Sequence, residues 1–314
     1  MTDEKPCSLP RSEQLSFVEQ WALLKLVGLA SICTEGCQIA EQVLEHRWQT
    51  ALSAMTEHDE VVAIVRSAMR SFDAVLSGSR CVAIFDDKKA FTPGDWDWYV
   101  ADYGYDLFVQ FIKDHLDGTV IFQSSDYSAH AKHAVPSFTQ DSGITHRTRI
   151  RTPRGTHDVI CSRTSSPLLP LALFHSSIVM NFFTADGFCI EYPDTFFARV
   201  SVKARRSMVT SDHHAFAKYE QRGYTFIDIP PHFVASPVEG ECSRGYCPRT
   251  VRRFGDEFSL AFVFKHQKGD QASKLHPSYP ARVSWRRGGH GCGGDDCQGE
   301  YSPVVYSMLL LTPR

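Results

Sequence analysis

Apolar residues recur at helical spacing over much of the first 116 residues of the chain. This pattern predicts helices over 13–50, 58–72 and 105–116. The second of these has acidic residues in its first turn, where the helix dipole favours them. Between the second and third helices, residues 74–80 predict a short apolar strand that ends in Gly-Ser, and residues 81–85 predict a helix that turns back from it.

Farther along the chain the pattern alternates between strands and helices. Residues 91–100 predict a Pro-Gly loop followed by a strand of alternating Asp and aromatic residues. Polar and β-branched residues alternate over 144–162, which predicts a hairpin with a Pro-Arg-Gly turn. The mostly apolar run 170–184 predicts a helix, 188–193 a strand, and 212–227 a helix that a glycine ends.

The composition changes beyond about residue 230, where Pro, Gly, Cys and Arg become frequent and helical patterns stop. Residues 258–264 and 301–311 predict strands in this region. We therefore expect an α/β (α+β) fold with a soft boundary near residue 235. The expected parts are an N-terminal arm and helix (1–57), a central domain (58–234) and a Cys/Gly-rich C-terminal region (235–314).

The overall composition is that of a globular protein, since 43% of the 314 residues are hydrophobic and 22% are charged. This excludes a wholly disordered, collagen-like or coiled-coil chain. Lys and Arg number 33 and Asp and Glu 36, so the net charge is −3. Without a global positive field, binding of long nucleic acid is not favoured.

No run of the sequence approaches the roughly 18 apolar residues of a membrane helix. The N-terminus also lacks the basic-then-apolar order of a secretory signal. We therefore expect an intracellular protein, in the cytoplasm or the nucleus, without a membrane partner. Its ten cysteines would be kept reduced there.

Three short motifs indicate the chemistry of the central region. Gly78-Ser79 follows the first predicted strand, and a Gly-Ser turn into a helix presents N–H groups and a hydroxyl that suit a phosphate. Asp95 and Asp97 lie two positions apart on a predicted strand, so both carboxylates share one face. Asp158, on the return strand of the hairpin, offers a third. Such carboxylates bind Mg²⁺, and a two-metal site clamps both oxygens of a phosphoryl displacement.

This ordered set of motifs resembles the nucleotidyltransferase superfamily, whose minimal domain is the polymerase-β-like fold. The resemblance covers roughly residues 58–230, and LSGSRCVAIFDDKKAFTPGDWDWYV, THDVICS and CPRTVRRFGD also resemble segments of a group of uncharacterised fungal proteins with this domain. It implies a mixed sheet flanked by helices. Two features depart from the family pattern. Fifteen residues separate Ser79 from Asp95, slightly more than usual, and His157 stands where the family has an apolar residue.

The resemblance also implies roles for the matching residues. Gly78 and Ser79 would hold the triphosphate of an NTP, and Asp95 and Asp97 would bind both metal ions, Mg²⁺ or Mn²⁺. Asp158 would bind the catalytic ion and help activate the acceptor. The expected activity is transfer of an NMP from an NTP to an unknown acceptor hydroxyl. The alternative is a catalytically inactive protein of this fold that senses nucleotides or binds a partner, and it is favoured if Asp158 points away from the other two.

Two basic residues are further candidates for contact with nucleotide phosphates. Arg80 directly follows the Gly-Ser pair and offers a fork of donors, although a surface ion pair explains it equally well. Lys218 lies four residues before Arg222 on a predicted helix. In the superfamily a basic residue of a later helix often touches the phosphates, but a solvated helix face is the simpler interpretation.

The C-terminal region contains two cysteine pairs that suit a structural zinc site. The candidate ligands are Cys242, Cys247, Cys292 and Cys297, with His290 as an alternative. Four intervening residues within each pair are at the loose edge of zinc patterns, so unpaired thiols in a loose tail are the competing interpretation. Four protein ligands would leave no open position, so zinc here would be structural.

Overall fold

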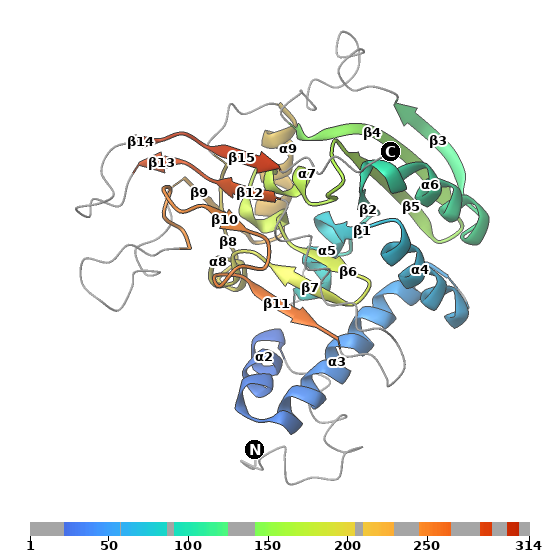
Figure 1. The fold of residues 1–314 in the computed structure, drawn as a ribbon, viewed down its shortest axis with the longest axis horizontal. Helices are drawn as coiled ribbons and strands as arrows, with labels where there is room; N and C mark the ends of the chain where they lie inside the picture. The colour runs from blue at the N-terminus through green and yellow to red at the C-terminus, as the bar shows by residue number, and fades with distance from the viewer. Residues whose placement is uncertain are drawn as a thin grey trace.

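The computed structural model describes most of the central part of the chain and several segments on either side. The described residues are 22–56, 58–86, 91–124, 142–204, 210–228, 245–264, 283–290 and 300–307. Within them the chain forms an α+β fold, a mixed sheet flanked by helices, as the sequence predicts (Figure 1).

The N-terminal helices are α2 (Leu23–Ile32), α3 (Thr34–Ser53) and α4 (Asp59–Ser71). The prediction of one helix over 13–50 is wrong at Cys33, whose extended backbone separates α2 from α3 and whose Sγ accepts a hydrogen bond from the N–H of Gly36 (3.3 Å). The apolar spacing continues across this break, so the pattern does not reveal it. Among the described residues, no helix is both long and apolar enough to cross a membrane.

The remaining helices in the described part of the chain have twelve residues or fewer. They are α5 (Gly78–Phe85), the 3-10 turn η2 (Asp102–Gly104), α6 (Tyr105–His115), α7 (Leu169–Ala172), the 3-10 turn η4 (Ser177–Val179), α8 (Pro193–Phe197) and α9 (Thr210–Gln221). The helix predicted to end at Gly223 is α9, and that glycine follows it with a positive φ of 82°. This φ favours glycine at the end of a helix.

The central sheet, as far as the chain is described, has eight strands. They are β1 (Ala74–Ser77), β2 (Asp95–Val100), β3 (Thr119–Ser124), β4 (Ile144–Thr152), β5 (Gly155–Ser162), β6 (Phe182–Thr184), β7 (Gly187–Ile190) and β11 (Leu260–Val263). Their order is β11-β7-β6-β1-β2-β5-β4-β3. Strands β2 and β5 run parallel, and the other neighbours are antiparallel. The hairpin predicted over 144–162 is β4 and β5.

The two faces of this sheet are covered by different parts of the chain. On one face Trp96 and Trp98 are buried in a cluster with residues of α3, α4, α5 and α6. On the other face Tyr99 and Ile160 belong to a second cluster, which includes Trp285 from the C-terminal region. Because successive side chains of β2 alternate, its two aspartates lie on the second face, opposite the tryptophans.

The helix predicted over 170–184 is wrong. The segment instead contains α7, the turn η4 and strand β6. Its polar side chains bond to the backbone: Ser177 Oγ accepts from Val202 N (2.9 Å), and Asn181 Nδ2 donates to the carbonyl of Ile178 (2.8 Å). Such bonds compete with helical ones. A mostly apolar run does not by its pattern distinguish a buried helix from buried strands.

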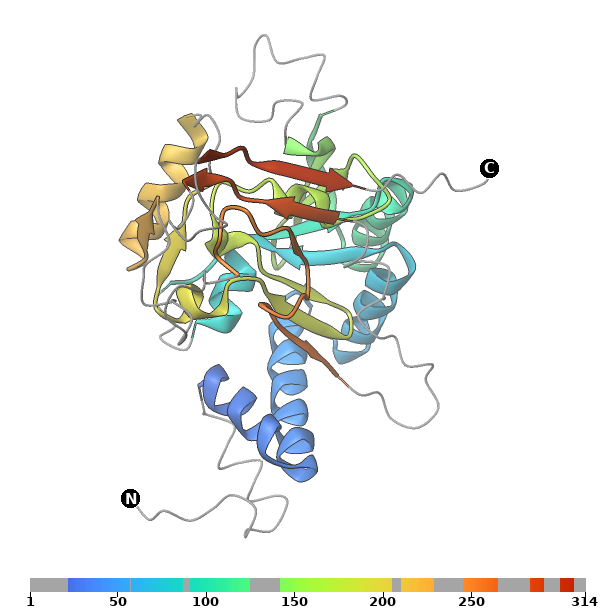
Figure 2. The ribbon, with the colours of Figure 1, turned by 60° about the vertical axis from the view of Figure 1, so that its left-hand side comes forward.

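The C-terminal region adds to the same structure. Strand β11 pairs with β7 in the central sheet, which agrees with the strand predicted over 258–264. The smaller strands are β8 (Val200–Val202), β9 (Thr225–Ile227), β10 (Arg252–Arg253), β12 (Val283–Arg286), β13 (Gly289–His290), β14 (Glu300–Tyr301) and β15 (Val304–Ser307). They form the sheets β10-β12-β15, β13-β14 and β8-β9. Figure 2 shows β12 and β15 far from the N-terminal helices α2 and α3.

Candidate metal centre

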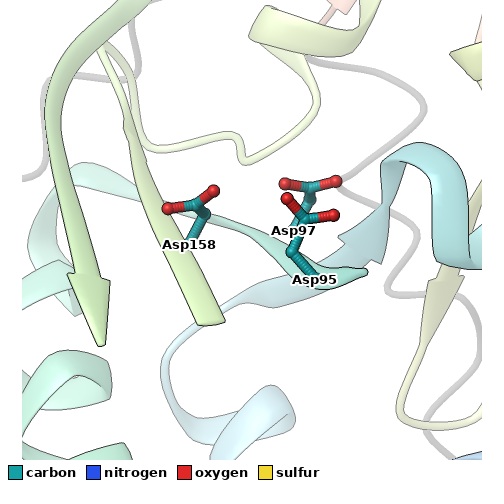
Figure 3. A group of neighbouring side chains, drawn as sticks. All are labelled: Asp95, Asp97 and Asp158. Carbon is teal, nitrogen blue, oxygen red and sulfur yellow. The ribbon is translucent and has the colours of Figure 1, made fainter. Parts of the chain in front are cut away.

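Three carboxylates meet on the face of the sheet opposite Trp96 and Trp98. Asp95 and Asp97 project from β2, and Asp158 projects from β5, where the parallel register places it beside Asp97. One oxygen of each lies within 4.8 Å of one oxygen of the other two. Figure 3 shows the three carboxylates pointing to the same side of the two strands. The chain therefore brings together the three aspartates that the sequence motifs identify.

Gly78 allows the backbone to approach this cluster closely. It ends the turn from β1 into α5 with φ of +68°, a conformation that side chains rarely adopt. A Cβ atom placed on it would lie 2.2 Å from Oδ2 of Asp97. The preceding residue, Ser77, pairs with Asp97 across the two strands. Only glycine fits here without moving either the turn or the carboxylate.

Replacing Gly78 with alanine is expected to cost about 1–3 kcal/mol of stability, because it adds backbone strain and a clash with Asp97. The same change should weaken Mg²⁺ binding, since the carboxylate must move. Urea unfolding and calorimetric titration with Mg²⁺ measure the two effects. Gly94→Ala is the matched control, because a Cβ at that exposed position meets no atom within 4 Å. Equal behaviour of the two variants would contradict the role given to Gly78.

Ser79 offers a hydroxyl in the first turn of α5. Its side chain is buried, and its Oγ has no hydrogen-bond partner in the described part of the chain. A buried hydroxyl without a partner costs free energy. A ligand oxygen at this turn would supply the missing bond, and it would lie at the positive end of the helix dipole.

The carboxylates differ in how readily they ionise. Burial, together with repulsion from Asp95 and Asp158, raises the pKa of Asp97 to about 7, although the charges of Arg147 and Lys218 oppose the shift. Burial also disfavours the charge on Asp158, but hydrogen bonds from Arg149 and Arg147 outweigh it and hold that pKa below its ordinary value. Asp158 is therefore a stable anion, whereas Asp97 takes up a proton near neutral pH.

This difference predicts a pH dependence for metal binding. Below about pH 7 a cation must displace the proton of Asp97, so the dissociation constant for Mg²⁺ should fall about tenfold per pH unit as the pH rises and level off above that value. Calorimetric titration over this pH range tests the expectation. In Asp97→Asn the binding should be weaker and its slope with pH should be lost. A slope that persists in the asparagine variant would assign the proton to another group.

Two arginines that sequence reasoning did not identify complete the cluster. Arg149 pairs with Asp158 across β4 and β5. Its Nε and Nη2 donate to the two carboxylate oxygens (2.8 and 2.7 Å), and those of Arg147 donate to the same two oxygens (3.3 and 2.7 Å). The sequence contains a signal for these two residues, because Arg-x-Arg on a strand places both side chains on one face, here the face of Asp158. The cross-strand register was needed to connect them.

His157 faces away from the cluster, into the core. Its Nδ1 accepts a hydrogen bond from Trp98 Nε1 (3.1 Å), and its ring lies parallel to that of Trp96 with the centroids 6.0 Å apart. Burial and the nearby charge of Arg80 lower its pKa to about 3, so the ring is neutral. The histidine thus occupies an apolar position of the strand, and its presence leaves Asp158 on the opposite face.

The other basic candidates differ in how they interact with the residues of the site. Arg80 stacks on Trp96, with its guanidinium carbon 3.8 Å from the ring centroid, and its Nε donates to the carbonyl of Asp95 (3.1 Å). It therefore fastens the start of β2. Lys218, on α9, acts on Asp97 through its charge. Arg222 follows that helix and lies 3.8 Å over the ring of Phe91.

The predicted zinc ligands are mostly beyond the described residues. Cys247 is half-buried and is not in a disulfide. Cys242, Cys292 and Cys297 lie outside the residues that the structure describes. Within the described ranges, the aspartate cluster is the one group of three or more His, Cys, Asp and Glu side chains arranged to hold a metal ion.

Comparisons of the chain with models of protein families, with known proteins and with solved structures find no match. The fold and the site thus define a class by geometry: an α+β protein with three neighbouring carboxylates that could hold a metal ion.

Proposed function

We propose that this protein is a metal-dependent nucleotidyltransferase, which moves an NMP from an NTP to an acceptor hydroxyl. The observation that supports it best is the meeting of Asp95, Asp97 and Asp158 beside the Gly78-Ser79 turn. The order of the elements, a strand, the Gly-Ser turn, a helix, the Asp-x-Asp strand and a later strand with the third Asp, is the order that the sequence resemblance implies.

The donor set fits Mg²⁺ or Mn²⁺. All three candidate ligands are carboxylates, and hard divalent cations prefer oxygen donors. The buried Oγ of Ser79, without a partner among the described residues, is a second sign that a ligand belongs at this turn. When bound, the metal would neutralise charge on the phosphates and orient the attacking and leaving oxygens.

The residues of the chain have separate tasks in this proposal. Ser79 and the first N–H groups of α5 bind the triphosphate, where the dipole of the helix favours an anion. Lys218 and Arg222, at α9, add positive charge on the side of Asp97 and Asp95. Asp158 lies on the far side of the cluster from the Gly-Ser turn, so in this proposal it is the carboxylate on the acceptor side.

The proposed transfer needs no covalent bond between the protein and the nucleotide. The acceptor oxygen forms a bond to the α-phosphorus, the bond from that phosphorus to the bridging oxygen breaks, and pyrophosphate leaves. In this proposal Asp158, which the resemblance implies helps to activate the acceptor, takes up the proton of the acceptor hydroxyl. Catalysis then consists of positioning and of charge stabilisation in a preorganised site.

A thermal shift with each of the four NTPs, with and without Mg²⁺ or Mn²⁺, tests this proposal first. Ligand binding adds about 2.7 kcal/mol of stability at a hundredfold excess over Kd. We expect a metal-dependent shift that Asp95→Ala/Asp97→Ala abolishes and that Asp106→Ala, at an exposed position of α6, retains. Release of pyrophosphate during an acceptor screen then detects transfer. A folded protein that shifts with no NTP would contradict the proposal.

One observation favours a second function, a catalytically inactive module that binds nucleotides. Arg147 and Arg149 already satisfy both oxygens of Asp158, which is the carboxylate nearest to the acceptor side. Such a module would show the metal-dependent NTP shift without release of pyrophosphate. Either function would use NTPs and Mg²⁺ of the cytoplasm or the nucleus, where we expect this protein.

A further inference from the structure

We infer that Arg147 and Arg149 form a binding site for a phosphate group of the acceptor, so that the proposed transferase acts on a phosphorylated acceptor. This inference rests on the proposed function, and it names the class of the second substrate. It starts from where the strands place the arginines, and it concerns residues that no motif of the sequence identified.

The strand order divides the site into two sides. Gly78 and Ser79 follow β1, the carboxylates project from β2 and β5, and the arginines project from β4. The proposed triphosphate site is therefore on one side of the three aspartates, and the arginines are on the other. An acceptor that approaches the α-phosphate in line with the leaving pyrophosphate comes from the arginine side.

The paired donors of the two arginines suit an anion with more than one oxygen. Each presents Nε and Nη2 to the same pair of carboxylate oxygens, at 2.7–3.3 Å. Arg149 Nη2 also lies 3.9 Å from Asp95 Oδ2. The guanidinium fork matches phosphate as well as carboxylate geometry, and such bidentate bonds are the strong ones.

The side chains of the two arginines are more exposed to solvent than that of Asp158, their partner. The side chain of Asp158 is only 2% exposed, whereas those of Arg147 and Arg149 are 25% and 37% exposed. The carboxylate is thus covered by the two guanidinium groups, and these reach the solvent. A ligand that arrives from solvent on this side meets two positive charges first.

Charge balance then couples phosphate binding to metal binding. Without a metal, the two arginines offset the negative charge of the aspartates. A divalent cation held by Asp158 would offset the same charge, and the arginines would be left with excess positive charge on a half-exposed surface. A phosphate would restore the balance. Since each ligand favours the state that binds the other, Mg²⁺ and phosphate should bind cooperatively, by the same factor in either order.

Titration calorimetry with inorganic phosphate, without any nucleotide, tests this inference. For the wild-type chain we expect saturating Mg²⁺ to lower the dissociation constant of phosphate about tenfold or more, within the usual range of such couplings. In Arg147→Gln/Arg149→Gln that gain should disappear. Arg151→Gln, at an exposed position that pairs with Thr156 rather than with Asp158, should retain it.

A second comparison covers the case in which the double variant fails to fold. Asp158→Asn frees the arginines from their carboxylate, so it should bind phosphate tightly without Mg²⁺. Arg147→Gln/Arg149→Gln/Asp158→Asn contains no buried charge at these positions and should bind phosphate weakly in either condition. If phosphate binds equally to these two variants, or if Mg²⁺ leaves the affinity of the wild-type chain unchanged, the inference is wrong.

The NTP thermal shift separates this result from a failure of the proposed function. A normal metal-dependent shift without phosphate coupling would overturn only the arginine site. Phosphate coupling without any NTP shift would support the arginine site and contradict the transferase.

Discussion

Asp97→Asn is expected to lower the rate of the proposed nucleotidyl transfer about a thousandfold, the largest effect on activity of any single change suggested for this protein. Asp97 is the middle carboxylate, beside Asp158 across the strands and on the same face as Asp95. Its loss removes a ligand shared by the proposed ions, and these contribute several kcal/mol of transition-state stabilisation. Each 1.36 kcal/mol is worth about tenfold in rate. Pyrophosphate release at saturating NTP measures it.

The same substitution, Asp97→Asn, should raise the stability of the metal-free protein even though it lowers the activity. Burial and neighbouring carboxylates raise the pKa of Asp97, so its charge destabilises the metal-free fold above about pH 7. Removing that charge should raise the melting temperature at pH 8 without metal. Asp106→Ala, at an exposed position on α6, should change neither property. An asparagine variant that is less active because it is less stable would contradict this account.

The sequence predicted the carboxylates of this site but not their counterions. Alternation along 91–100 was enough to place Asp95 and Asp97 on one face, because side chains of a strand alternate with a period of two. Asp158 could be added because it lies in a well-patterned hairpin. The arginines were not predicted, since their importance depends on the pairing of Arg149 with Asp158, and a strand pattern alone leaves such a register open.

The errors in the predicted fold have a similar origin. The run 170–184 is mostly apolar, and its short helix, 3-10 turn and strand depend on hydrogen bonds to distant elements, such as the one between Ser177 and Val202. The break at Cys33 depends on a side-chain cap that hydrophobic spacing does not report. In both places local propensity was consistent with a helix and tertiary contacts decided against it.

The stretch CPRTVRRFGD, which the sequence resemblance identified without a role, fastens the C-terminal region to the central sheet. Arg252 is buried and donates to the carbonyls of Glu191 (2.9 Å) and Gly245 (2.8 Å) and to both oxygens of Asp256 (2.6 and 2.9 Å). Glu191 directly follows β7, and its side chain is fully buried. Burial raises its pKa to about 7, although the charge of Arg252 opposes the shift.

Arg252→Ala is therefore expected to destabilise the protein by about 3–5 kcal/mol, the largest effect on stability among these predictions. The substitution leaves buried carboxylates and carbonyls without their donor, and breaking a buried ion pair from one side has this cost. Guanidinium unfolding at pH 8, where Glu191 is charged, measures it. Arg253→Ala, at the exposed neighbouring position, should change stability by less than about 0.5 kcal/mol. If both substitutions cost the same, the buried cluster around Arg252 does not hold the C-terminal region to the sheet.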